Sequence, residues 1–483
     1  MKTCIPFFRN KQKSLIQSLF CAAKVGSRTA AGALFVFLCC AFAQAQAQQQ
    51  ATPTDTLELR LDDAVQSAVT GNPDVLIAQI GMRRANSQLK AANGNRLPTV
   101  GIDGQYARNL KRPVFFLPAD SNFPGGGGGG PEEGTVIEAG FDNSYQLAAQ
   151  ASVPLFNMQV SAGAKAAETA MAVNERGVDI TRNDIRMQVQ KAYYDALLAQ
   201  ESLVVLTQSL ENAQQNFRNT QNQFAQELVP QYDVIRSEVQ VENIRPNILQ
   251  AENNLEAAIS NLKLLANIPD EQPVTLVQTL QEFLDNINPE LISSYDVAQN
   301  PNLLQLDAQR VLQQQQIKVQ QASYYPSVSA FGNYALQTQA NTFDFRNYFW
   351  VNTSAVGLQL SVPIFQGFIR MRQVEQARLD LEQVEIQQKY LTKSLTIQSR
   401  NALNRIKRAR AALEAQQDNI AQAQKGFEIA QVSYRSGVGT LIEANDAELA
   451  LTQSRLSYLE VVYEYLNAVA DFEQLTGTKS KGR

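Results

Sequence analysis

Residues 61–99 read LDDAVQSAVTGNPDVLIAQIGMRRANSQLKAANGNRLPT, and residues 294–327 read SYDVAQNPNLLQLDAQRVLQQQQIKVQQASYYPS. Both stretches have an Asn-Pro pair before the main apolar run and a proline after it, at an offset of 228 residues. These are Asn72-Pro73 with Asn300-Pro301, and Pro98 with Pro326. Further along, VPLF at 153–156 matches VPIF at 362–365. The chain therefore contains two copies of one unit, and this repeat decides the fold.

Each copy is expected to contain a long helix, because apolar residues and alanines recur at alternating steps of three and four. In the first copy they are Ile185, Val189, Ala192, Ala196, Ala199, Leu203, Leu206, Leu210, Ala213, Phe217 and Phe224, with Thr220 in the same phase. In the second copy they are Leu395, Ala402, Ile406, Ala409, Leu413, Ile420, Ala423, Phe427, Ala430 and Tyr434. A seam of period 3.5 predicts coiled-coil packing, and its alanines predict closely spaced helices.

The long helices, about 159–226 and about 366–435, end at turn signals, Leu228-Val229-Pro230 and Gly437-Val438-Gly439. A shorter helix is expected to run back from each turn. Pro246 lies inside the first of these and is expected to kink or break it.

Helix lengths predict how these segments are arranged. At 1.5 Å per residue, residues 159–226 would span about 100 Å, whereas residues 74–97 and 231–267 would span roughly 36 and 55 Å. The two shorter helices, placed end to end, nearly equal the long one. We therefore expect each long helix to lie antiparallel to two stacked shorter helices.

Between the helical stretches the period changes to two. Apolar residues alternate with polar or small ones over about 99–108 and 144–154, and again over about 327–337 and 352–363. Each stretch has close to the roughly 9–11 residues of a transmembrane β-strand. Four strands cannot close a membrane barrel, whose smallest form has about eight, and lipid does not tolerate an open sheet edge. The chain must therefore oligomerise if these strands span a membrane; an antiparallel sheet on a soluble core is the alternative.

The composition excludes most catalytic chemistry. The 483 residues contain no histidine, and the four cysteines are Cys4, Cys21, Cys39 and Cys40. Ser-His-Asp and Cys-His catalysis, haem with a histidine ligand and the usual zinc sites are therefore excluded. We expect no enzyme activity, no cofactor and no metal site.

Residues 1–47 are expected to be a secretory signal peptide, because a basic leader precedes an apolar run from Ala30 to Ala43 and small residues follow. Removing the six cations of this leader leaves 36 basic against 46 acidic residues, which disfavours nucleic acid as a partner. No later segment offers the ~20 apolar residues of a spanning helix. A mature membrane protein would therefore have to cross with strands.

The order of helix, strand, strand, long helix, turn and returning helix, present twice, resembles the TolC-like outer-membrane efflux proteins of Gram-negative cell envelopes. The resemblance covers roughly residues 57–477. Its most specific parts are LDDAVQSAVTGNP (61–73), VGLQLSVPIFQGFIRMRQVEQAR (356–378) and YRSGVGTLIEANDAEL (434–449).

The resemblance implies a mainly α fold with membrane β-strands. In it, a homotrimer would form a twelve-stranded β-barrel in outer-membrane lipid, joined to an α-helical barrel that extends through the periplasm. It also implies a periplasmic adaptor and an inner-membrane pump of RND or ABC type. The repeats are expected at 48–267 and 297–477, with a linker at 268–296 and a tail at 478–483.

The candidate functional residues lie at the helix turns farthest from the strands, since that end must close at rest. Glu443 and Asp446 follow the second turn and lie three residues apart, so they share one helix face. In a trimer they would form carboxylate rings that attract cations and repel anions. Stabilisation of a helix N-terminus by acids is the alternative.

The resemblance places Tyr434, Glu443 and Asp446 at aperture-lining and gating positions. It places Asp233 with Arg236 at the equivalent turn of the first copy, where capping and a solvated ion pair are the alternative. The tip turns themselves contain Gly437, Gly439 and Pro230, and Pro230 stands where the family usually has a turn glycine.

These features favour an outer-membrane exit duct that passes substrate from a periplasmic adaptor and inner-membrane pump to the exterior. The alternative is a structural tether that spans the periplasm without transport. The basic cluster of Arg405, Lys407, Arg408 and Arg410 is interpreted as a solvated helix face, with a charged tunnel wall or adaptor contact as the alternative. The glycine run Gly125–Gly130 is expected to be a loop tip outside the cell.

Overall fold

The computed structural model describes residues 56–117, 135–138, 140–287 and 296–477. The chain divides into a unit of residues 1–57 and a unit of residues 58–483, and nearly all described residues belong to the second. The expected signal peptide, the glycine run Gly125–Gly130 and the tail at 478–483 lie outside the described residues.

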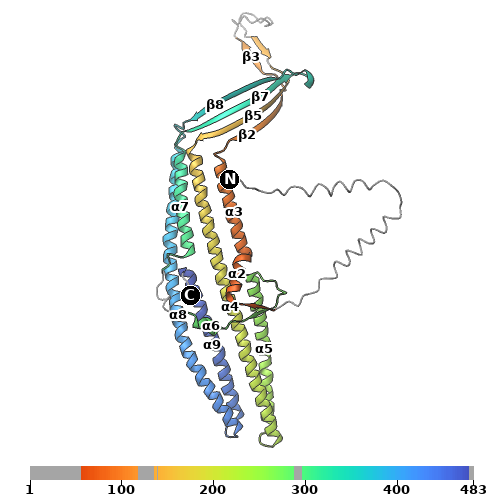
Figure 1. The fold of residues 1–483 in the computed structure, drawn as a ribbon, viewed down its shortest axis with the longest axis vertical. Helices are drawn as coiled ribbons and strands as arrows, with labels where there is room; N and C mark the ends of the chain where they lie inside the picture. The colour runs from red at the N-terminus through yellow and green to blue at the C-terminus, as the bar shows by residue number, and fades with distance from the viewer. Residues whose placement is uncertain (1–55, 118–134, 139, 288–295, 478–483) are drawn as a thin grey trace, which may run out of the picture. The chain divides into compact units, whose positions relative to one another are not determined.

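The first repeat is organised around one long helix, α4 (Met158–Ala225). The helices α3 (Pro73–Gly94) and α5 (Gln231–Ala266) both pack along it, and α2 (Leu61–Gly71) precedes α3 (Figure 1). Because α3 leads into the sheet and α5 returns from the far turn, both run antiparallel to α4. This is the predicted arrangement.

The second repeat has the same plan, with α7 (Pro301–Ala322) and α9 (Leu441–Thr476) packed along α8 (Ile369–Arg435). The Asn-Pro pairs begin α3 and α7. The Asn72 side chain accepts a hydrogen bond from the backbone N–H of Asp74 (2.9 Å), and Asn300 does the same for Asn302 (2.9 Å). The helix α4 also packs against α7 and α9, which joins the two repeats.

The helix α5 continues through Pro246, so the expected break does not occur. Pro246 lies on an exposed face of the helix, and so does Glu242, whose carbonyl loses its N–H partner. That carbonyl can bond to water instead, which lowers the cost of the proline.

Four strands form one antiparallel sheet in the order β2-β5-β7-β8. They are β2 (Thr99–Arg108), β5 (Asn143–Phe156), β7 (Ser327–Ala340) and β8 (Val351–Ser361). A separate two-stranded ribbon joins β3 (Val114–Leu117) to β4 (Thr135–Glu138). The fold class is therefore as predicted, mainly helical with long helix pairs and β-hairpins.

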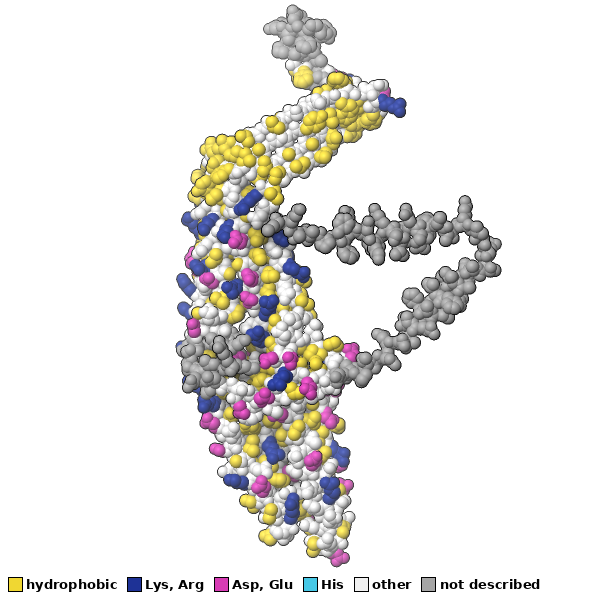
Figure 2. All heavy atoms as spheres, in the orientation of Figure 1, with side chains coloured by type: hydrophobic (Ala, Val, Ile, Leu, Met, Phe, Trp, Pro, Cys, Tyr) yellow, Lys and Arg dark blue, Asp and Glu magenta, His cyan; other side chains and the backbone are white. Residues whose placement is uncertain are grey.

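The strand register separates the sheet into an apolar and a polar face. The apolar face carries Val100, Ile102, Leu147, Tyr334, Leu336, Val356 and Leu358. The opposite face carries Asp103, Gln105, Gln146, Gln150, Asn333, Gln337 and Gln359. Val356 is 90% exposed, so a single chain leaves the apolar face uncovered. Figure 2 shows hydrophobic side chains gathered over the sheet and charged ones over the helices.

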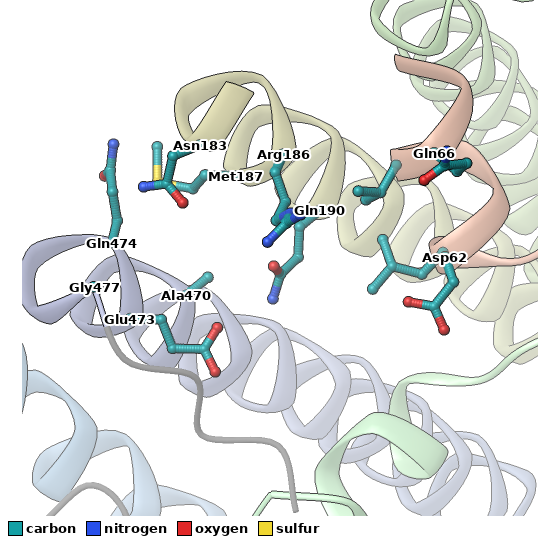
Figure 3. A pocket seen from close by; sticks show the side chains of 12 residues that line it. Asp62, Gln66, Asn183, Arg186, Met187, Gln190, Ala470, Glu473, Gln474 and Gly477 are labelled. Carbon is teal, nitrogen blue, oxygen red and sulfur yellow. The ribbon is translucent and has the colours of Figure 1, made fainter. Parts of the chain in front are cut away.

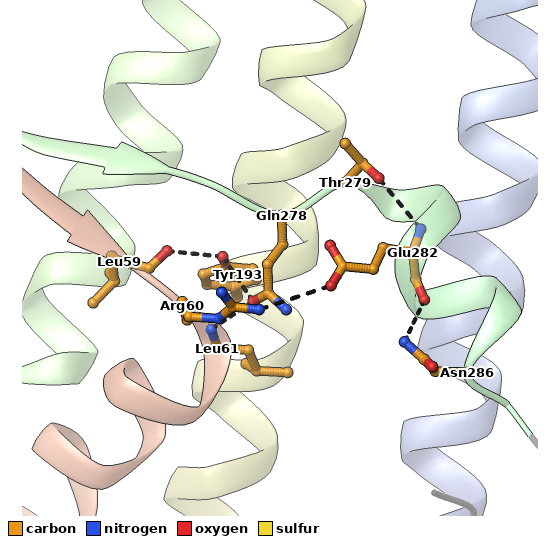
Figure 4. Close-up of polar contacts among 8 residues, drawn as sticks. All are labelled: Leu59, Arg60, Leu61, Tyr193, Gln278, Thr279, Glu282 and Asn286. Carbon is orange, nitrogen blue, oxygen red and sulfur yellow. Dashed lines mark hydrogen bonds and ion pairs between the residues drawn. The ribbon is translucent and has the colours of Figure 1, made fainter. Parts of the chain in front are cut away.

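The segment expected as a linker contains regular structure. It holds β6 (Val274–Leu276), which pairs with β1 (Leu57–Leu59), and the short helix α6 (Leu280–Asp285). Thr279 caps α6 by accepting a hydrogen bond from the N–H of Glu282 (3.3 Å; Figure 4).

Three polar contacts fasten this segment and the start of α2 to α4 and to each other. The Tyr193 hydroxyl donates to the Leu59 carbonyl (2.9 Å), and the Gln278 side-chain carbonyl accepts from the Leu61 N–H (2.9 Å; Figure 4). The Glu201 carboxylate accepts from the Leu280 N–H (2.7 Å). These contacts surround the largest apolar core, to which α2, α4, α5, α6 and α9 contribute. The segment is therefore packed against the helices.

An ion-pair cluster also joins the repeats. Asp471 of α9 bonds to Lys191 of α4, and its Oδ2 lies 3.1 Å from Nη2 of Arg405 on α8. Arg405 is thus paired, although it belongs to the basic cluster interpreted as a solvated face. Arg410 of that cluster pairs with Glu414 (3.6 Å) and remains exposed. Within the described ranges, no helix has the length and apolar composition needed to cross a membrane.

Candidate functional site

The two helix turns lie at the ends of the α4/α5 and α8/α9 pairs remote from the sheet (Figure 1). The second turn is closed by glycines. Gly437 has φ of 76°, in the left-handed region, and the Gly439 N–H donates to the Ser433 carbonyl (2.9 Å). A Cβ on Gly439 would lie 2.9 Å from the Ser433 Cβ, so this position has no room for a side chain. The backbone conformation of this turn therefore requires glycine at both positions.

The first turn follows the same path without glycine. Glu227 has φ of 59° and corresponds to Gly437 at an offset of 210 residues. Pro230 corresponds to Thr440, since each is the N-cap residue of its returning helix. Within this chain, then, Glu227 takes the left-handed position of the turn glycine, while Pro230 is the N-cap residue just before α5.

Glu443 and Asp446 are both exposed on α9. Glu443 forms a capping box with Thr440: its carboxylate accepts from the Thr440 N–H (2.9 Å), and its own N–H donates to the Thr440 hydroxyl (3.3 Å). Glu443 therefore stabilises the start of α9, which is the alternative to gating, whereas Asp446 has no hydrogen-bond or ion-pair partner in the described part of the chain.

Asp233 and Arg236 lie in the first turns of α5 and are both half-buried. No ion pair joins them within the described residues. Asp233 instead acts on the second repeat, because its negative charge helps to raise the pKa of the Tyr434 hydroxyl on α8.

Tyr434 is buried, with 5% of its surface exposed, and its hydroxyl lies 2.7 Å from the Thr220 hydroxyl of α4. Thr220 donates its own hydrogen to the Asn216 carbonyl (2.9 Å), so Tyr434 is the donor to Thr220. Burial is the largest cause of the raised pKa of Tyr434. In the single chain, Tyr434 therefore joins the two repeats and does not line an opening.

The contact surface between the two repeats, here called the seam, changes from apolar to polar along the length of α4. Near the middle of α4 it is apolar, with Val189 and Leu197 packed in one core with Val462 and Leu466 of α9. Toward the tip, two polar contacts cross it: the Ser209 hydroxyl donates to the Glu448 carboxyl (3.5 Å), and the Thr220 and Tyr434 hydroxyls lie 2.7 Å apart. Sequence reasoning missed Glu448; its place among apolar residues of α9 was the only available signal. Buried polar groups make the tip end of the seam the easier end to separate.

A cleft of about 360 Å³ lies among α2, α4 and α9. Arg186 and Gln190 of α4 project into it, facing Glu473 of α9 and Asp62 of α2 (Figure 3). Its lining contains no activated nucleophile beside a base. Across the described ranges, no group of three or more acidic, cysteine or histidine residues is placed to hold a metal.

The family model described as "Outer membrane efflux protein" matches residues 64–267 and 295–478, which include both repeats and both tip turns. The chain belongs to the outer membrane efflux protein family. Its members are outer-membrane channels of tripartite efflux or secretion systems, and not enzymes. The family also fits the uncovered apolar face of the sheet.

Relatives of this outer membrane efflux protein match over most of its length. The cobalt-zinc-cadmium resistance protein CzcC of Cupriavidus metallidurans is 23% identical over 357 residues, covering 72% of this chain and 81% of CzcC. The outer membrane protein TolC of Salmonella enteritidis is 22% identical over 384 residues, covering 77% of this chain and 75% of TolC. The crystal structure of the Campylobacter jejuni CmeC outer membrane channel superposes with a TM-score of 0.66 at 19% identity, covering 86% of this chain and 85% of CmeC.

Proposed function

We propose that three copies of this chain form the exit duct of a tripartite efflux or type I secretion system. The observation that carries this proposal is the four-stranded sheet, which has one apolar exposed face and two unpaired edge strands, β2 and β8. In lipid, unpaired backbone groups at those edges would cost several kcal/mol each. Pairing β8 of one copy with β2 of the next removes both edges, and three copies give a closed barrel of twelve strands.

The two faces of the sheet support one orientation in this barrel. The apolar face, with Val100, Ile102, Val356 and Leu358, faces outer-membrane lipid. The glutamine-rich face lines the lumen, where Gln150 donates to the Asp103 carboxylate (2.7 Å). The long helices then continue the lumen into the periplasm. A periplasmic adaptor binds the helical end, and an inner-membrane pump of RND or ABC type supplies the energy.

The tip turns are the gate of this duct. Glu443 and Asp446 of three copies form two carboxylate rings around the axis, with Asp233 and Arg236 behind them on the neighbouring helix. Tyr434 holds the turns together at rest. Gly437, Gly439 and Pro230 set the path of the turns.

The oligomer is tested by native mass spectrometry of the detergent-extracted mature protein. A species of three protomers is the expected result. A monomer or a dimer that stays folded in detergent would contradict the trimer, because a monomer leaves both edges of its four-stranded sheet open and a dimer would close a barrel of eight strands, not twelve. A structural tether needs no lumen and should conduct no ions, whereas the duct should conduct them. A measurement of ion conductance therefore distinguishes the two.

A further inference from the structure

Glu448 of α9 is unusual for a charged residue type. Among the described residues, it is the only Asp, Glu, Lys or Arg that is buried, with 2% of its surface exposed. Its Oε1 accepts a long hydrogen bond from the Ser209 hydroxyl of α4 (3.5 Å). Its Oε2 is buried and has no hydrogen-bond partner in the described structure. A carboxylate held this way lacks the hydrogen bonds and the positive charge that would offset the cost of removing it from water.

The groups around Glu448 supply no positive charge. On α4, Ser209 and Asn212 bond to it and both are neutral. Glu211 of α4 is exposed and accepts a hydrogen bond from the Gln208 side chain (3.4 Å).

Within the described structure, no charged group of α8 or α9 forms a hydrogen bond or an ion pair with Glu448. On α8, Glu428 accepts a hydrogen bond from Gln424, and Lys425 is exposed. On α9 itself, Arg455 donates to Gln424. Burial, opposed only by the bonds to Ser209 and Asn212, raises the pKa of Glu448 to about 7.

The position of Glu448 gives its charge a mechanical consequence. It lies seven residues after Leu441, the first residue of α9, and it faces α4 across the seam between the repeats. This is the polar end of the seam, beside the proposed gate. Separating the α4/α5 pair from the α8/α9 pair would expose the Glu448 carboxyl to water.

We propose that Glu448 is a protonation-controlled latch: its neutral carboxyl permits the closed seam, and its ionisation favours separation of the two helix pairs at the tip. The latch rests on the proposed function, because it regulates the same gate. A carboxyl that ionises more easily in the open state shifts the open-to-closed ratio by about tenfold for each unit of pKa difference. Opening is therefore favoured above neutral pH and opposed below it.

The test is single-channel recording of the mature oligomer in a planar lipid bilayer, from about pH 6 to about pH 8.5. Glu448→Gln has nearly the shape of the neutral acid and cannot ionise. Glu464→Gln is the matched control, because Glu464 is an exposed acid on the same helix. We expect the open probability of the wild type and the control to rise roughly tenfold with pH. The open probability of Glu448→Gln should stay at the low value of the wild type at about pH 6 over the whole pH range.

A second measurement separates the latch from a folding defect. Hydrogen exchange of residues 441–452, corrected for the intrinsic effect of pH, should lose protection at high pH in the wild type and keep it in Glu448→Gln. Conductance that is independent of pH in the wild type, or that rises equally in Glu448→Gln, overturns the latch and leaves the duct intact. Silence of the wild type even at the highest pH contradicts both the latch and the duct.

Discussion

The hydroxyl groups of Thr220 and Tyr434 lie 2.7 Å apart and join the two repeats close to their tips. Thr220 is five residues from the end of α4, and Tyr434 is one residue from the end of α8. Both side chains are buried, so water does not replace the bond while the seam is closed. The bond therefore contributes to the closed state and is lost when the tips separate.

Removing this bond should make the channel leakier. Tyr434→Phe keeps the ring and removes the donor, at a cost to the closed state of about 0.5–1.5 kcal/mol in each protomer. We expect more frequent opening in planar bilayers than in the wild type. Tyr390→Phe is the control, because Tyr390 is 74% exposed on the same helix. Wild-type behaviour of a folded Tyr434→Phe protein would exclude a role for the bond in closure.

The charge of the tip acids can be tested without removing the helix cap. In Glu443→Gln combined with Asp446→Asn, the glutamine can still accept the bond from the Thr440 N–H, so α9 should begin as before. We expect reduced cation preference in reversal-potential measurements and weaker block by multivalent cations. Asp418→Asn, which removes an exposed acid from α8, should change neither. Equal ion selectivity in the double variant and the wild type would show that the limiting ring lies elsewhere.

The tip glycines should tolerate substitution poorly. Gly437→Ala places a Cβ at φ of 76°, which costs about 1–2 kcal/mol, and Gly439→Ala brings a Cβ to 2.9 Å from that of Ser433. Gly426→Ala is the matched control in α8, where a Cβ meets nothing within 4 Å and should stabilise the helix by about 1 kcal/mol. Thermal denaturation followed by circular dichroism compares the three. A Gly437→Ala protein as stable as Gly426→Ala would contradict the turn geometry.

The raised pKa of Glu448 should make the free energy of unfolding depend on pH. Its pKa rises from 4.5 to about 7 on folding, so the folded chain binds a proton that the unfolded chain releases between these values. The resulting penalty is absent below pH 4.5, grows as the pH rises, and saturates above about pH 7 at roughly 3 kcal/mol. Glu448→Gln should therefore be more stable than the wild type at pH 8 and similar at pH 4.5 in chemical denaturation. A stability difference that does not change with pH would mean that Glu448 is already ionised in the fold.

The sequence predicted the architecture well because the architecture depends on long periodic patterns. Ile185, Val189, Ala192 and Ala196 are buried as the period of 3.5 requires. The pattern fails toward the tip, where Phe224 is exposed while Ser209 and Asn216 are buried. There the buried face of α4 includes polar side chains beside Ala213, so hydrophobicity alone does not identify it.

The details of the site could not be predicted because they depend on contacts between distant segments. Thr220 for Tyr434, Lys191 for Asp471 and Ser209 for Glu448 are partners that lie more than 200 residues away in the chain. The sequence predicts a linker after α5, since no local pattern indicates that the Leu280 N–H donates to the Glu201 carboxylate. Gating roles for Asp233, Arg236, Glu443 and Asp446 remain predictions.

The most direct test of the account is the single-channel conductance of the purified mature protein in a planar bilayer under a salt gradient. An oligomeric duct with acidic rings at a narrow tip should give small, discrete, cation-selective steps. Anion-selective steps would contradict the acidic gate. No conductance at any pH, from protein shown to be inserted, would contradict the duct and favour a structural tether.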